Sequence, residues 1–474
     1  MTGVRRESSF VQPMAGQIVQ PADAQLSVRS KVQSVTGQTE GKIRYAARIK
    51  STPCGDGRPT QVTAREDAHT PTPRIRFREF NQEWGKKKLG EIATLIARKN
   101  TALESNLPLT ISAEKGLVSQ TSFFNNRVAA QNVTHYYLIY RGEFAYNRSS
   151  SDGSPFGAVK RLDDYEKGVL STLYTVFASR SEFVDSNYLS VFFSTYLWHR
   201  DVRLHAAEGA RNHGLLNISA EDFFKTNIMM PPSLPEQQRI ASFFANLDET
   251  IAAAEARLGK LRQTKAAMLE KMFPRPGQAV PEIRFKGFEG KWEQSMAKQI
   301  FEQTNERNHP ELPVLSASQQ LGMIRRDEGG MNISHDKGNE PTYKRVRPRQ
   351  FVLHLRSFQG GFAHSAIDGI TSPAYTVFRF KNDSAHSDWF WKIVFMSETF
   401  IKSLRTITYG IRDGRSISYE EFEEMTLSYP SLSEQKRIAA FFHEMDALIS
   451  ATKAEAKKLR QVKAALLEGM FVQG

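Results

Sequence analysis

The most constraining feature of this sequence is a helix-forming segment that occurs twice. Residues 231–273 and 429–471 are identical at 25 of 43 positions, at a constant offset of 198 residues. A shorter similarity precedes each copy, because TPRIRFREFNQEW at 72–84 resembles VPEIRFKGFEGKW at 280–292. Internal repeats reflect repeated structural units, so the pattern predicts two related globular domains, each followed by the same helix.

Both copies carry the signals of a long coiled-coil helix. Ser233 with Glu236, and Ser431 with Glu434, predict a capping box at each start. Core positions then recur at alternating gaps of four and three residues, which is the heptad pattern. The predicted seam contains Ile240, Phe244, Leu247, Ile251, Leu258, Leu261 and Lys265 in the first copy, and Ile438, Phe442, Met445, Ile449, Leu459, Lys463 and Leu466 in the second.

The same seam position holds a lysine in both copies, Lys265 and Lys463. A polar seam residue can fix the register of a coiled coil. Alternatively, both ammonium groups extend out of the seam into solvent. The sequence leaves both interpretations open.

These features predict an α+β fold, in which two mixed α/β domains are separated by two long helices. If the repeats pack as equivalent halves, a pseudo-twofold axis makes the helices an antiparallel coiled coil. The expected parts are a disordered N-terminal extension at 1–71, globular domains at 72–232 and 275–430, and helices at 233–274 and 431–474.

Composition limits the class of protein. No apolar run approaches the roughly 18 residues of a membrane span, and the single cysteine, Cys54, excludes an internal disulfide and any site with several thiolates. We therefore expect a cytoplasmic protein. The 64 Lys and Arg residues against 51 Asp and Glu residues give a formal charge of +13. That surplus is compatible with a polyanionic partner such as nucleic acid.

The globular domains contain core and charged segments. Strand-like residues at 136–140, 174–177 and 375–380 accompany an apolar helix in each domain; we align Leu189, Phe192 and Phe193 of the first with Phe390, Ile393 and Val394 of the second. The segment 341–356 carries five Lys and Arg residues and no acid. A basic strand of this kind suits phosphate contact through Lys344, Arg345 and Arg347, although a solvated charged face is the alternative.

Comparing the repeats separates shared from variable polar residues. Arg211 and Arg412 occupy equivalent Gly-x-Arg turns, so we predict that both contact phosphate. After the aligned Phe144 and Phe351 the two domains differ, which makes this region a candidate for reading bases. The candidates are Asn147, Arg148 and Ser149 in the first domain, and Arg356, Ser357 and Gln359 in the second. An ordinary variable surface loop is the alternative.

Motifs for catalysis or tight cofactor binding are missing from the sequence. It contains no G-x-x-x-x-G-K-[ST] loop for ATP, no G-x-G-x-x-G dinucleotide turn and no H-E-x-x-H metal motif. We therefore predict no catalytic residues, no metal site and no cofactor bound by this chain.

The repeated helices LPEQQRIASFF…LRQTKAAMLEKMF and LSEQKRIAAFF…LRQVKAALLEGMF, with their PxIRFxxF starts, resemble the specificity subunit of type I restriction–modification systems. The resemblance covers about residues 72–474. It implies two target-recognition domains, each reading half of a bipartite, asymmetric site in double-stranded DNA. Helices would set the half-site spacing and dock two methyltransferase (modification) subunits, with restriction (motor–nuclease) subunits joining them.

By the same resemblance, S-adenosylmethionine, ATP and Mg²⁺ would belong to those partner subunits. Two other classes stay open at this point. One is a coiled-coil scaffold that binds proteins without recognising DNA, and the other is a nuclease with degenerate motifs.

Overall fold

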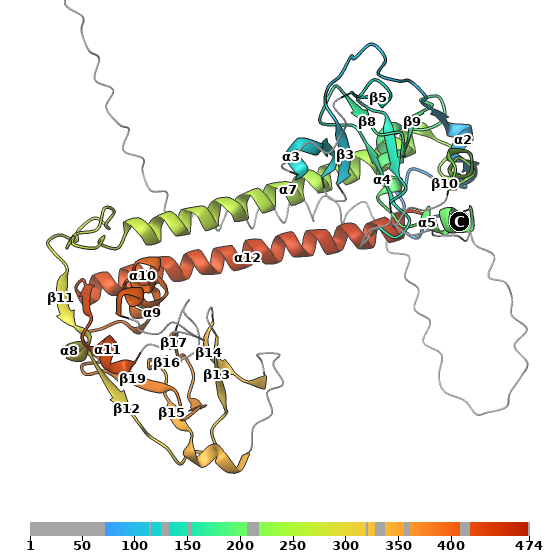
Figure 1. Ribbon diagram of the computed structural model, residues 1–474. Coiled ribbons are helices and arrows are strands. Elements are labelled where there is room, and N and C mark those ends of the chain that lie inside the picture. The colour runs from blue at the N-terminus through green and yellow to red at the C-terminus, as the bar shows by residue number, and fades with distance from the viewer. Residues whose placement is uncertain are drawn as a thin grey trace, which may run out of the picture. The chain divides into compact units, whose positions relative to one another are not determined.

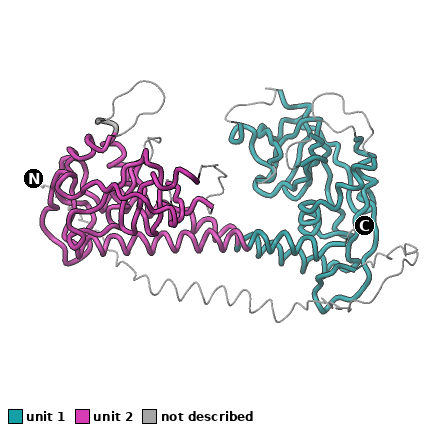
Figure 2. Tube along the Cα trace, turned by 90° about the horizontal axis from the view of Figure 1, so that it is seen from below, with its two compact units in different colours: residues 1–250, 459–474 teal, residues 251–458 magenta. Residues whose placement is uncertain are grey.

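The computed structural model describes residues 72–112, 115–124, 132–149, 154–205, 218–318, 321–327, 337–354, 361–407 and 418–472. The chain divides into two compact units, and Figure 2 colours them separately. Unit 1 comprises Met1–Thr250 and Leu459–Gly474, and unit 2 comprises Ile251–Lys458. Each unit therefore combines a globular domain with part of both long helices. The extension predicted at 1–71 lies outside the described residues.

The globular domain of unit 1 is built on a four-stranded antiparallel sheet of order β2-β9-β6-β7, of which Figure 1 labels β9. The domain also contains three two-stranded sheets, β1-β10, β3-β4 and β5-β8. The elements are β1 (Gly85–Lys88), α2 (Leu89–Ile92), β2 (Ala93–Leu95), β3 (Leu109–Ser112), β4 (Gly116–Ser119), α3 (Gln120–Phe124), β5 (Tyr137–Tyr140), β6 (Phe144–Asn147), β7 (Ala158–Arg161), β8 (Lys167–Leu170), β9 (Tyr174–Ser179), α4 (Ser186–Phe193), α5 (His199–His205), α6 (Ala220–Phe223) and β10 (Asn227–Met230).

The globular domain of unit 2 repeats this topology strand for strand. Its sheets have the orders β12-β19-β16-β17, β11-β20, β13-β14 and β15-β18. The mixed helix and strand content predicted for both domains is therefore confirmed. The elements are β11 (Glu293–Met296), α8 (Ala297–Ile300), β12 (Phe301–Thr304), β13 (Leu315–Ser318), β14 (Gly322–Arg325), η2 (Lys337–Thr342), β15 (Lys344–Val346), β16 (Phe351–Leu353), β17 (Phe362–His364), β18 (Gly369–Thr371), β19 (Thr376–Phe380), α9 (Asp388–Met396), α10 (Glu398–Ile407), α11 (Tyr419–Glu423) and β20 (Thr426–Tyr429).

Stacked phenylalanines occupy equivalent places in the two large sheets. Phe144 on β6 faces Phe177 on β9, and their ring centroids are 5.2 Å apart. Phe351 on β16 faces Phe378 on β19 at 5.5 Å. All four side chains are fully buried, and each contributes roughly 2–3 kcal/mol of apolar burial. These contacts support the alignment of Phe144 with Phe351.

The predicted alignment of the apolar helices α4 and α9 is wrong by one residue. The predicted residues are buried or partly buried in the two cores. However, Tyr188 of unit 1 packs against Trp84 and Phe471. In unit 2 the equivalent contacts, with Trp292 and Phe273, are made by Phe390. Phe192 therefore corresponds to Val394 and Phe193 to Phe395, at an offset of 202. An unequal loop before the helices caused the error.

The duplicated segments form the helices α7 (Leu234–Lys271, 38 residues) and α12 (Leu432–Met470, 39 residues). At 1.5 Å per residue each is about 57 Å long. Every predicted seam residue is buried or half-buried, and most of the residues between them are exposed, although Ala241 and Ala439 are also buried. The 3.5-residue spacing read from the sequence thus predicted which face of each helix is covered.

The two helices share a core within each unit, with opposite ends meeting. In unit 1, Phe244 near the start of α7 lies in one hydrophobic cluster with Met470 at the end of α12. In unit 2, Phe442 near the start of α12 clusters with Met272 just beyond the end of α7. Each globular domain is therefore packed against the first turns of one helix and the last turns of the other.

Both seam lysines form ion pairs with the facing helix. The Lys463 Nζ atom lies 2.5 Å from Asp248 Oδ1 in unit 1, and Lys265 pairs with Asp446 in unit 2. The lysine side chains are about one-quarter exposed, and both aspartates are more than half exposed. Of the two interpretations left open by the sequence, this geometry favours a role in register, because each lysine meets a specific partner instead of extending into solvent.

The predicted capping boxes are wrong in their glutamates. Glu236 and Glu434 do not accept hydrogen bonds from the serines at the helix starts. Each glutamate instead forms a bidentate ion pair with the arginine of a PxIRF segment. Arg76 donates to Glu236 at 2.7 and 2.8 Å, and Arg284 donates to Glu434 at 2.7 Å through both nitrogens. Both glutamate side chains are 1% exposed. The bond to arginine outcompetes the local bond because charge-assisted, bidentate hydrogen bonds are the stronger ones.

Candidate nucleic-acid interface

The predicted base-reading residues of unit 1 lie at the end of β6, where the chain leaves the sheet. The side chain of Asn147 accepts a hydrogen bond from the backbone N–H of Ser149 at 3.0 Å. Arg148 donates to the carbonyl oxygen of Ile218 at 2.9 Å and to that of Leu173 at 3.4 Å. All three residues are half-buried. Arg148 therefore ties the turn to two other segments, and its contact with a base stays a prediction.

The hairpin from β6 to β7 is held in shape by Gly157. Its φ angle is +81°, and a Cβ atom placed there would lie 2.1 Å from the carbonyl oxygen of Asn147. Only glycine fits such a position without moving the backbone. The hydroxyl of Tyr146 donates to the carbonyl of Phe156 at 2.9 Å, and burial raises the pKa of Tyr146 well above its ordinary value. These contacts fix the described base of the hairpin.

Five other predicted residues lie outside the described residues. They are the turn arginines Arg211 and Arg412, and the base-reading candidates Arg356, Ser357 and Gln359. Their DNA contacts stay predictions.

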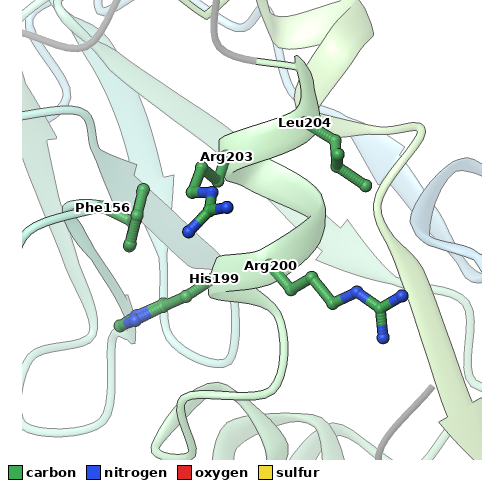
Figure 3. Close-up of a pocket in the computed structure, with 5 residues that line it drawn as sticks. All are labelled: Phe156, His199, Arg200, Arg203 and Leu204. Carbon is green, nitrogen blue, oxygen red and sulfur yellow. The ribbon is translucent and has the colours of Figure 1, made fainter.

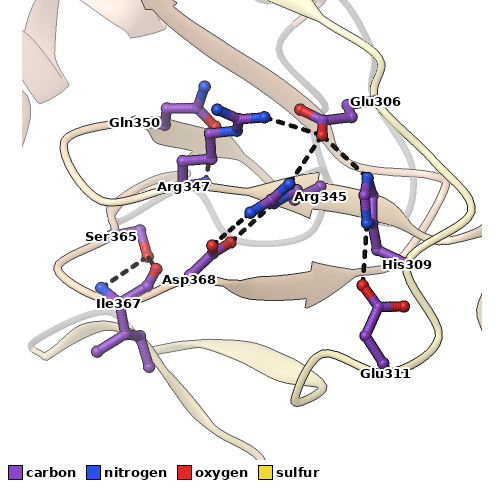
Figure 4. Close-up of polar contacts among 9 residues, drawn as sticks. All are labelled: Glu306, His309, Glu311, Arg345, Arg347, Gln350, Ser365, Ile367 and Asp368. Atoms are coloured by element: carbon purple, nitrogen blue, oxygen red, sulfur yellow. Dashed lines mark hydrogen bonds and ion pairs between the residues drawn. The ribbon is translucent and has the colours of Figure 1, made fainter.

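The predicted basic strand of unit 2 takes part in a charge network (Figure 4). Arg345, on β15, donates to both carboxylate oxygens of Asp368 at 3.0 and 2.6 Å and to Glu306 at 2.9 Å. Arg347 donates to the same Glu306 oxygen at 3.0 Å. Lys344 donates to the carbonyl of Tyr375 at 2.7 Å. These cations are therefore not an isolated positive run.

Electrostatics in this network stabilise the ionised acids. Arg347, and after it Arg345, lower the pKa of Glu306 to about 2. Arg345 lowers the pKa of Asp368. In turn, Asp368 and Glu306 raise the pKa of Arg345. His309 bridges Glu306 at 2.9 Å and Glu311 at 3.0 Å. These ion pairs hold the guanidinium groups in place.

Sequence reasoning missed these acids because they come from other segments. Glu306 precedes β15 by about 40 positions and Asp368 follows it by about 20, so a local count of charge found neither. The basic strand predicted at 341–356 thus has acidic partners from other segments, and its contact with phosphate stays a prediction. Within the network, the Arg347 side chain is 52% exposed and that of Arg345 is 19% exposed. Arg347 is thus the better placed of the two for an outside anion.

Comparison with known proteins now bears on the unit 1 domain. Residues 81–263 match the family model of the type I restriction modification DNA specificity domain. The matched residues run from just before β1 into α7 and include the large sheet, the predicted base-reading turn and most of the first long helix.

Solved structures are similar over most of the chain. An HsdS subunit from Thermoanaerobacter tengcongensis is 15% identical, with 82% of this chain and 97% of that chain covered and a TM-score of 0.44. A type I restriction–modification S subunit from M. genitalium is 14% identical, with 84% of this chain and 99% of that chain covered and a TM-score of 0.47.

Two searches of the described residues concern other classes of site. Among the parts of the chain that the structure describes, no group of three or more His, Cys, Asp or Glu residues is arranged to hold a metal ion. In the same residues, no helix is both long and apolar enough to cross a membrane.

Proposed function

We propose that the chain is the sequence-specificity subunit of a type I restriction–modification complex and that it binds double-stranded DNA. The observation that carries this proposal is the match of residues 81–263 to the type I DNA specificity domain. The strand-for-strand repetition of that topology in unit 2 extends it to the second domain. Specificity in such a chain resides in polar groups that reach base edges, with cations that contact phosphate.

Each globular domain reads one half of a bipartite, asymmetric site. The α7 and α12 helices form one antiparallel coiled coil whose halves are related by a pseudo-twofold axis, and its length sets the distance between half-sites. Support comes from the opposite helix ends that cluster in each unit and from the paired seam lysines. Two domains of different surface chemistry on a symmetric frame explain why the site is asymmetric.

The chain has no catalytic activity of its own. Two methyltransferase subunits dock on the helices, and restriction subunits join them. S-adenosylmethionine, ATP and Mg²⁺ act in those partners. The exposed faces of α7 and α12 support this arrangement, because they present long charged and polar surfaces between the domains' attachment points.

The test is to purify the chain with a type I methyltransferase subunit and to map methylated adenines on genomic DNA. We expect methylation at one bipartite sequence only when the chain is present. The matched control is the methyltransferase alone. Specific methylation by the methyltransferase alone would contradict the proposal, and a complex that shifts no duplex would favour the protein-binding scaffold. Cleavage of DNA by the isolated chain would favour the nuclease.

A further inference from the structure

A shallow pocket in unit 1 lies outside every candidate site considered above. Its volume is about 390 Å³, and it is lined by Phe156 from the β6–β7 hairpin and by four residues of α5: His199, Arg200, Arg203 and Leu204 (Figure 3). The lining contains two guanidinium groups and no carboxylate. A pocket of this composition favours an anionic ligand with an apolar part.

The acid beside the α5 arginines is engaged with another residue. Asp201 is the only acidic residue of α5, and its Oδ2 accepts hydrogen bonds from the backbone and side-chain nitrogens of Asn227, both at 2.7 Å. Arg200 and Arg203 are both exposed. In Figure 3 the guanidinium of Arg203 extends toward the side of the helix where Phe156 and His199 lie.

The wall of the pocket is apolar and fixed. The His199 ring lies 4.3 Å from the Trp198 ring and 5.3 Å from the Phe156 ring. Burial lowers the pKa of His199, so the imidazole is neutral near pH 7. Trp198 and Val202 are buried in the core, and Trp198 donates to the carbonyl of Phe193 at 3.2 Å. The helix therefore holds Arg203 at a defined place.

The second domain repeats the basic pattern. At the offset of 202 set by α4 and α9, the core residues Trp198 and Val202 correspond to Phe400 and Leu404, which are buried in α10. By the same offset, Arg200 corresponds to Lys402, and Arg203 to an arginine, Arg405. Both domains thus carry two basic residues three positions apart in the helix after the apolar one, and Lys402 is paired with Glu398 in α10. A feature common to domains that read different bases suits a ligand common to every sequence.

We propose that the α5 pocket binds a backbone phosphate of duplex DNA, with Arg203 as the principal donor. This inference rests on the proposed function and deepens it. Arg203 donates to a phosphate oxygen, and Arg200 adds a second positive charge nearby. Phe156 and Leu204 lie against the adjoining sugar. The contact is independent of sequence, because a phosphate is the same at every step of the duplex.

The test measures DNA binding by the complex of the chain with its methyltransferase, on a specific and a random duplex over a range of salt. Arg203→Ala should weaken binding to both duplexes about tenfold, because a charge-assisted hydrogen bond is lost. It should also flatten the slope of log K against log salt by about 0.9. Arg203→Lys should restore most of the slope. The matched control is Arg78→Ala, an exposed arginine of unit 1 outside the pocket.

Each outcome decides between the claims. Wild-type affinity and slope in a folded Arg203→Ala complex would overturn the phosphate site and leave the proposed function intact. Weakened binding to the specific duplex alone would overturn it in favour of a base contact. Saturable binding of inorganic phosphate to the DNA-free complex, lost in Arg203→Ala, would indicate a site for free phosphate instead. If the wild-type complex bound no duplex, both the proposed function and this inference would be overturned.

Discussion

The two globular domains share the ion pair that joins each of them to a long helix, and they differ in the contacts of one two-stranded sheet. Both anchor an arginine of the PxIRF segment to a buried glutamate of a long helix. The sheet β5-β8 of unit 1 pairs Lys167 with Glu104 and also has cations over its tyrosine rings, with the Arg98 guanidinium 4.2 Å from the Tyr140 ring centroid. Its counterpart β15-β18 in unit 2 carries the ion pair of Arg345 with Asp368. Duplication has preserved what holds the domain to the helices, while the surface chemistry has diverged.

The anchors also differ in one detail, which predicts the largest effect. Trp84 donates to Glu236 at 3.3 Å, whereas the buried Trp292 Nε1 has no hydrogen-bond partner among the described residues. Glu236→Ala should therefore destabilise unit 1 by about 3–5 kcal/mol, because it leaves the largely buried Arg76 guanidinium without its carboxylate partner. Glu434→Ala should cost unit 2 about 1 kcal/mol less, since no indole loses a partner.

Urea unfolding, with hydrogen exchange to assign the change to a unit, measures both losses. The control is a pair of double variants, Arg76→Met with Glu236→Leu and Arg284→Met with Glu434→Leu, which remove both charges and should recover much of the stability. Losses below about 1 kcal/mol for the single variants would show that the anchors do not hold the domains to the helices.

The β6–β7 hairpin offers a change confined to one domain. Gly157→Ala adds a Cβ that collides with the Asn147 carbonyl, in addition to roughly 1–2 kcal/mol of left-handed strain. Gly142→Ala is the matched control, because its φ of +87° gives the same strain with open space around the Cβ. Methylation mapping should show altered discrimination at a single half-site for Gly157→Ala. Equal changes at both half-sites would contradict a separate reading by each domain.

The seam ion pairs should respond alike in the two units. Lys463→Met and Lys265→Met each remove a pair whose aspartate is more than half exposed, so the coupling energy should be about 0.2–1 kcal/mol. Double-mutant cycles with Asp248→Asn and Asp446→Asn measure it. A coupling in one unit only would show that the two halves of the helix pair are not equivalent.

The smallest effect concerns pH and belongs to unit 2. The folded-state pKa of Glu306 is about 2, below the ordinary value of 4.5. Its contribution to stability is therefore complete above about pH 4.5 and is lost as the pH falls toward 2. Because the side chain is about one-third exposed, solvent screening keeps this contribution below about 1 kcal/mol.

Glu306→Gln should accordingly reduce unit 2 stability at neutral pH, and the difference from wild type should shrink on acidification. Urea unfolding at several pH values measures this difference. A difference that grows below pH 4.5 would contradict the assigned direction of the pKa shift.

What the sequence predicted well is what short-range periodicity determines. The heptad spacing identified the buried face of both helices, and the repeat placed Phe144 and Phe351 at equivalent positions in the sheets. Partners distant in sequence were missed. Arg76 meets Glu236 across 160 residues, and Arg148 bonds a backbone carbonyl 70 residues away, which no side-chain pattern indicates.

Local rules failed where a tertiary contact was stronger. The capping-box motif correctly placed Glu236 at a helix start, but its carboxylate binds Arg76 and not the serine. The α5 pocket was missed because its wall comes from a hairpin and its cations from a helix. One signal could have revealed it: the basic pair on α5 recurs on α10, once the domains are aligned at the offset of 202 instead of 201.

The central claim is that one helix pair holds two different readers at a set distance. Inserting one heptad after Leu258 and another after Ala456 keeps the phase of every seam residue and lengthens both helices by about 10.5 Å. That length corresponds to about three base pairs of duplex. Methylated adenines are then mapped with the methyltransferase present. We expect the same two half-site sequences with a gap about three base pairs longer, whereas efficient methylation at the original spacing by the folded insertion variant would show that the helices do not set the spacing.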